Sequence, residues 1–131
     1  MRATINGLRI AIVALGFYWL LLFIGTHIPP NQLLGKINQS DKLLHLLAFA
    51  GLAFLMCWAL PTIRSQMYRN TLTGGGICVL YAAIDELLQI PVGRTADWND
   101  FFADCAGICI GMAVYTVARS VLLKTQWNLL R

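Results

Sequence analysis

Four apolar segments dominate the sequence, and each approaches the length needed to cross a lipid bilayer. They cover residues 10–28, 43–60, 71–90 and 101–123. A helix needs roughly 20 residues to cross about 30 Å of hydrocarbon. Within lipid every backbone N–H and C=O needs a partner, which leaves helices or closed barrels, and these segments lack the alternating pattern of barrel strands. The sequence therefore predicts an all-α bundle of four transmembrane helices.

The composition agrees with a single small membrane domain. The chain has 131 residues, of which 58% are hydrophobic and 12% charged, and its mean hydropathy is +0.65. These values lie outside the usual range of soluble domains. The first segment follows Arg2 and Arg9 and ends at Pro29 and Pro30 without a small-residue cleavage site. We therefore expect it to be retained as a helix rather than removed as a signal peptide.

The basic residues are distributed unevenly between the two sides of such a bundle. Seven of the ten lie in the N-terminal region, the second connection or the C-terminal end: Arg2, Arg9, Arg64, Arg69, Arg119, Lys124 and Arg131. The other three, Lys36, Lys42 and Arg94, lie toward the opposite side. The positive-inside rule then predicts that both termini are cytoplasmic. The net charge of +4 is read as a topology signal, so no nucleic-acid partner is expected.

The six acidic residues all gather toward the predicted outer side. They are Asp41, Asp85, Glu86, Asp97, Asp100 and Asp104. A charged side chain at the centre of a transmembrane helix costs roughly 2.5–3.5 kcal/mol on insertion scales. Asp85 and Glu86 lie inside the third segment, so they are expected to face the bundle interior with Lys42, His45 or Arg94 as partners. The sequence therefore predicts a polar cleft at the extracytoplasmic face.

Helical spacing brings several of these polar residues onto shared faces. Asp41 and His45 are i,i+4 neighbours, and Glu86 and Gln89 are i,i+3 neighbours. The last segment carries a stripe of acids above small residues, formed by Asp97, Asp100, Asp104, Gly107 and Gly111. Small residues four apart allow close helix packing in membranes, so Gly107 and Gly111 are the candidate packing residues. The candidate binding residues are Asp41, Lys42, His45, Asp85, Glu86, Gln89, Arg94, Asp100 and Asp104.

These motifs resemble the VanZ-like family of small membrane proteins. The resemblance runs from Asp41 to Gly111 and rests on three motifs in order: Asp41-Lys42-x-x-His45-x-x-x-Phe49, Asp85-Glu86-x-x-Gln89 followed by Arg94, and Asp100-x-x-x-Asp104-x-x-Gly107-x-x-x-Gly111. Leu88 stands where many relatives have a histidine, so any role of that histidine has no counterpart here. The family takes its name from an accessory protein of glycopeptide resistance associated with teicoplanin. The resemblance thus implies a place in the bacterial cytoplasmic membrane and a link to the cell envelope.

Three functions remain open from the sequence. The first is binding of an outer-leaflet lipid or a lipid-linked envelope precursor, which would influence envelope properties or sensitivity to glycopeptide antibiotics. The second is an enzyme acting on such a lipid, using general acid–base chemistry or a divalent cation held by Asp41, His45, Glu86 and Asp104. The third is a structural or assembly role. The sequence leaves the cofactor and the oligomeric state undetermined and contains no nucleophile motif or phosphate loop that would favour the enzyme.

Overall fold

The structure, a computed structural model, describes residues 2–28, 40–60, 66–93 and 97–129. Within these residues the chain forms four long helices, α1 (Arg2–His27), α3 (Ser40–Ala59), α4 (Met67–Gln89) and α5 (Trp98–Leu129). A short 3-10 helix, η2 (Ile90–Val92), follows α4. Each long helix contains a window that is long and apolar enough to cross a membrane. The prediction of an all-helical chain with four such segments is therefore confirmed.

Individual residues determine where the helical segment of α4 and η2 ends and where α5 begins. Pro91 has no backbone N–H to continue the helix. Gly93, two residues later, has a φ of 81°, the left-handed conformation that is common where helices end. The N–H of Gly93 donates to the carbonyl of Ile90 at 3.1 Å. Asp97 then caps α5, because its Oδ1 accepts the backbone N–H of Asn99 at 2.8 Å. The turn and the cap fix where each helix stops and starts.

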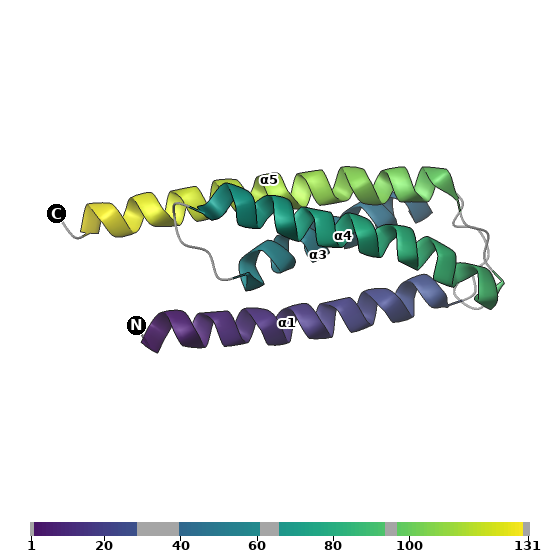
Figure 1. The fold of residues 1–131 in the computed structure, drawn as a ribbon, viewed down its shortest axis with the longest axis horizontal. Coiled ribbons are helices and arrows are strands. Elements are labelled where there is room, and N and C mark those ends of the chain that lie inside the picture. The colour runs from purple at the N-terminus through teal and green to yellow at the C-terminus, as the bar shows by residue number, and fades with distance from the viewer. Residues whose placement is uncertain (1, 29–39, 61–65, 94–96, 130–131) are drawn as a thin grey trace.

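The helices run roughly along one axis, so the bundle has two ends (Figure 1). The start of α1 and the end of α5 lie at one end, and α3 finishes and α4 begins toward the same end. We call this the basic end, because Arg69, Arg119 and Lys124 lie toward it. At the opposite end α1 and α4 finish and α3 and α5 begin (Figure 1). We call this the polar end, and its residues form the candidate site described below.

The core lies around α3. The buried share of its candidate span is 39%, against 11% for α1, so α3 is central and α1 peripheral. Phe49, Leu52 and Ala53 of α3 are fully buried. The Tyr18 hydroxyl of α1 donates to the carbonyl of Ala48 in α3 at 2.9 Å. Many large apolar side chains face outward instead, including Val13 at 71% exposure, as expected of a surface that meets lipid tails.

Candidate functional site

A buried pair of side chains joins α3 to α5 at the polar end. Nδ1 of His45 lies 3.0 Å from Oδ1 of Asp104. The His45 side chain is 4% exposed and that of Asp104 is fully buried. Because a carboxylate can only accept, the imidazole donates through Nδ1 when Asp104 is ionised. The pair therefore holds the ring in a fixed orientation.

The glycine seam explains why these two side chains meet. A Cβ atom at Gly107 would collide with the carbonyl oxygen of Leu46, and one at Gly111 would collide with that of Ala50. Both glycines thus let the backbone of α5 touch the backbone of α3. Asp104 lies one turn before Gly107 on the same face of α5. Close approach of the two helices therefore brings Asp104 against His45.

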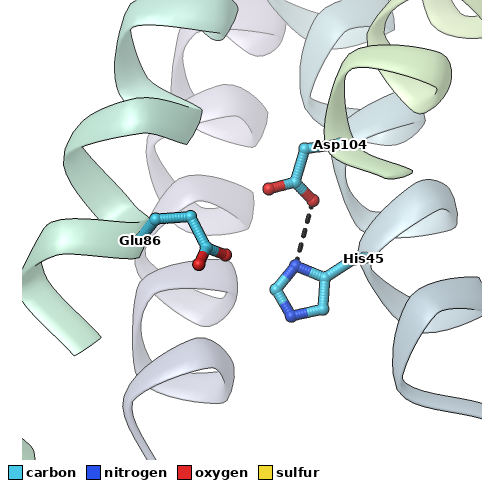
Figure 2. A group of neighbouring side chains, drawn as sticks. All are labelled: His45, Glu86 and Asp104. Carbon is cyan, nitrogen blue, oxygen red and sulfur yellow. Dashed lines mark hydrogen bonds and ion pairs between the residues drawn. The ribbon is translucent and has the colours of Figure 1, made fainter. Parts of the chain in front are cut away.

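Glu86 completes a three-residue cluster from the other side of this interface. Its carboxylate extends from α4 toward His45 and Asp104 (Figure 2). One nitrogen or oxygen atom from each of the three side chains can be chosen so that all lie within 4.8 Å of one another. Oε2 of Glu86 accepts the backbone N–H of Asp97 at 2.9 Å, which ties the cluster to the start of α5. We call His45, Glu86 and Asp104 the acidic cluster.

Two oxygen atoms of the acidic cluster are buried and accept no hydrogen bond from the described residues. They are Oε1 of Glu86 and Oδ2 of Asp104. An ionised carboxylate in an apolar medium is costly unless it is paired or hydrogen-bonded. Two adjacent carboxylates share this problem and repel each other when both are charged. Such a cluster favours a bound cation, a shared proton, or a polar ligand that donates hydrogen bonds.

Asp85 forms a second, separate network that links α1 to α4. It is fully buried and accepts hydrogen bonds from the hydroxyls of Thr26 and Tyr81 and from the amide of Gln89, each at 3.1 Å. His27 lies nearby, with Nδ1 3.9 Å from Oδ1 of Asp85. Gln89 therefore bonds to Asp85 rather than entering the acidic cluster. The three donors together satisfy the buried carboxylate of Asp85. The network therefore has a structural role, which is to hold α1 against α4.

Three residues of this network, Thr26, Tyr81 and His27, were not predicted from the sequence as site residues. A signal was present for two of them, because Thr26 and His27 are polar residues that end the first apolar segment. Tyr81 precedes Asp85 by four residues and so shares its helix face. This spacing alone does not predict the hydrogen bond from the Tyr81 hydroxyl to Asp85, because tyrosine is also common as a packing residue in helix cores. Only the packing of α1 on α4 reveals the network.

The remaining candidates occupy different positions. Asp97 caps α5 and donates its N–H to Glu86. Asp100 is half-buried in the first turn of α5. Lys42 is exposed. The side chain of Asp41 and the whole of Arg94 lie outside the described residues, so the structure does not place them relative to the acidic cluster.

A groove between α4 and α5 leads to the acidic cluster. Its volume is about 250 Å³, and it is lined by Ala83, Glu86, Leu87, Asp97, Trp98 and Phe101. Leu87 and Trp98 are 64% and 76% exposed, so the groove opens on the outer surface of the bundle. Its lining is mostly apolar with acidic groups at one place, which is the usual composition of a small-ligand site.

Comparison with known proteins supports the resemblance of the motifs. The family model described as VanZ/LLP1 matches residues 8–119, which includes all three motifs and parts of every long helix. Searches of curated proteins and of solved structures find no match. The family match covers most of the chain, and the four candidate spans agree with a membrane protein. The chain therefore belongs to the VanZ/LLP1 family.

Proposed function

We propose that this protein binds the headgroup of a membrane lipid or of a lipid-linked envelope precursor at its polar end. The observation that carries the proposal is the position of Glu86, which lines the groove between α4 and α5 and also belongs to the acidic cluster. A lipid chain lying along the apolar lining would bring its headgroup to the carboxylates. Polar contacts in a site that largely excludes water discriminate well between headgroups.

The rest of the polar end supports this assignment. The buried oxygens of Glu86 and Asp104 can accept hydrogen bonds from hydroxyl, amide or amine groups of a headgroup. Lys42, together with Arg94 as expected from the sequence, would meet phosphate or carboxylate groups. A protein that sequesters or presents such a lipid influences the envelope, and sensitivity to glycopeptide antibiotics would follow from the amount of target lipid left accessible.

Lipid retention after purification tests the proposal. We expect Ala83→Phe, which fills the groove, to reduce the co-purified lipid about tenfold, the effect of losing roughly 1.4 kcal/mol of binding free energy. Glu86→Gln and Arg94→Ala should act in the same direction. The measurement is native mass spectrometry of protein in mild detergent, with extraction and identification of the bound lipid.

Ala106→Phe is the matched control, because Ala106 is an exposed residue of α5 that does not line the groove. It should retain lipid at the level of the unmodified protein. Equal lipid retention in Ala83→Phe and Ala106→Phe would exclude this groove as the site. A parallel loss of folded protein and lipid in every variant would instead favour the structural role.

The proposal also needs the polar end to face the outside of the cell. The basic asymmetry of the sequence favours this orientation, because seven of the ten Lys and Arg residues belong to the N-terminal region, the second connection or the C-terminal end. In a cysteine-free variant, we expect Ala96→Cys to be labelled in intact cells by a membrane-impermeant thiol reagent. Gln66→Cys, in the connection before α4, should be labelled only after the membrane is opened. The reverse labelling pattern would contradict the orientation.

A second candidate function is catalysis on such a lipid, and the hydrogen bond between His45 and Asp104 supports it. A carboxylate that orients an imidazole is a recurring arrangement for acid–base catalysis. Glu86 would then be a second acid or base within reach of the same headgroup. Incubation of the purified protein with labelled envelope lipids would separate the two functions, because a binding protein returns its ligand unchanged and an enzyme forms a product that disappears in His45→Gln.

A further inference from the structure

The acidic cluster has the geometry of a metal site. We propose that His45, Glu86 and Asp104 together bind one divalent cation of the zinc and manganese class. The three ligand atoms lie within 4.8 Å of one another, and they come from three different helices. A cation held here would therefore cross-link α3, α4 and α5 at the polar end.

The distances allow coordination with small side-chain rotations. Metal bonds to nitrogen and oxygen are about 2.0–2.2 Å long, so two ligand atoms on one ion lie at most about 4.4 Å apart. The 3.0 Å between Nδ1 of His45 and Oδ1 of Asp104 matches two adjacent ligands at a right angle. A rotation of the Glu86 side chain would bring one of its oxygens, which lies within 4.8 Å of the other two ligand atoms, to the spacing of a third ligand. The cation would replace the proton shared by His45 and Asp104.

The unsatisfied oxygens are the independent observation that points to a ligand. Glu86 is 6% exposed and Asp104 fully buried, yet Oε1 and Oδ2 accept no hydrogen bond from the described residues. Both carboxylates point into the cluster (Figure 2). By contrast, the buried carboxylate of Asp85 has three donors within 3.1 Å. The chain thus satisfies one intramembrane acid with its own groups and leaves two others oriented toward a common point.

Charge and ligand type select the class of cation. Two ionised carboxylates and a neutral imidazole carry two negative charges, and a divalent ion would balance both. Uncompensated charge is most costly in such a buried position. The imidazole ligand suits zinc, and the two carboxylates also suit manganese, whereas magnesium and calcium are usually bound by oxygen ligands alone. Three protein ligands leave further positions on the ion for water or a headgroup oxygen. Contact between the ion and a phosphate rests on the proposed function, whereas binding of the ion does not.

Metal analysis tests the inference directly. The full chain, carrying an affinity tag without histidines, is produced with zinc and manganese in the medium and purified in detergent without chelator. We expect about one zinc or manganese per chain by elemental mass spectrometry. Because loss of even an outer-shell partner lowers metal affinity about 10–100-fold, His45→Gln, Glu86→Gln and Asp104→Asn should each lose at least tenfold in affinity.

Two controls isolate the acidic cluster. His27→Gln removes the only other histidine of the chain and should retain the metal. A variant with Cys105 and Cys109 replaced by alanine removes two thiols one helical turn apart and should also retain it. The lipid-blocked variant Ala83→Phe should keep the metal and lose the lipid, so that failure of the proposed function and failure of this inference can be told apart.

The thermal stability of the unmodified protein gives a second test, which does not depend on whether the variants fold. After removal of metal by chelator, zinc or manganese should raise the unfolding temperature of the unmodified protein, and magnesium and calcium should not. Metal-free protein from supplemented cells together with no such thermal shift would overturn the inference. Retention of the metal by a folded His45→Gln/Asp104→Asn variant would overturn it as well, and so would equal loss of metal from His27→Gln.

Discussion

Replacing Gly107 with alanine is expected to lower the free energy of unfolding by about 3 kcal/mol, the upper part of the range for overpacking. The added Cβ would collide with the carbonyl oxygen of Leu46 and lie 3.1 Å from the backbone nitrogen of Ala50. These are backbone atoms of α3, so no side-chain rotation relieves the contact. α5 must move away from α3, and the most extensive helix contact of the described bundle is lost. Gly111→Ala should act in the same way through Ala50.

Gly76→Ala is the matched control, because a Cβ at Gly76 meets nothing within 4 Å. It should be neutral or slightly stabilising, since alanine favours helix more than glycine does. Thermal and denaturant-induced unfolding in one detergent, followed by helical circular dichroism, gives the comparison. If Gly107→Ala and Gly76→Ala unfold together, the helices are not in backbone contact at this seam.

Hydropathy predicted the helices well but not their ends. The predicted segment 101–123 lies within α5, which spans Trp98–Leu129 and has 32 residues. At 1.5 Å per residue α5 is about 48 Å long, more than the hydrocarbon thickness. Hydropathy detects only the part of a helix that is apolar. The helix itself extends beyond the apolar part, and its limits are set by caps and helix-breaking residues. At the start of α5 the limit is set by the cap that Asp97 provides.

Helical periodicity predicted the stripe on α5 and the importance of the glycines. Asp104, Gly107 and Gly111 do share one face, and that face contacts α3. Periodicity describes one helix at a time, so it gave no indication of which neighbour the face would meet. The contact with Leu46 and Ala50 depends on how the helices are arranged in three dimensions.

For the polar residues of α4, too, helical periodicity does not predict which neighbouring helix each side chain meets. Asp85 and Glu86 are adjacent in sequence, and successive residues of a helix point about 100° apart. Asp85 therefore meets Thr26 of α1, whereas Glu86 faces His45 and Asp104. The i,i+3 spacing predicted that Gln89 would share a face with Glu86, but Gln89 hydrogen-bonds to Asp85, from which it is four residues away. Both spacings were available, and only the position of α1 separates the two networks.

Breaking the buried pair of His45 and Asp104 is also expected to change the free energy of unfolding strongly, and a double-mutant cycle measures this effect. His45→Leu leaves the fully buried carboxylate of Asp104 without its imidazole partner. Breaking a buried pair in this way typically costs about 3–5 kcal/mol, because the remaining charge is uncompensated. Replacing both partners with apolar residues is often neutral. We therefore expect His45→Leu/Asp104→Val to recover most of the stability lost in His45→Leu, with a coupling of about 2–3 kcal/mol.

The same double variant separates a structural role of the pair from a ligand-binding role. If the pair only holds α3 in register with α5, an apolar replacement that restores stability should also restore the amount of bound lipid. If the cluster binds a headgroup, the stable double variant should still lose the lipid, because neither leucine nor valine can offer a polar atom to it. Unfolding curves and native mass spectra of the four proteins of the cycle give both readouts on the same samples. Additive losses of stability would show that the two side chains do not interact, whereas recovered stability without recovered lipid would assign the pair to the ligand.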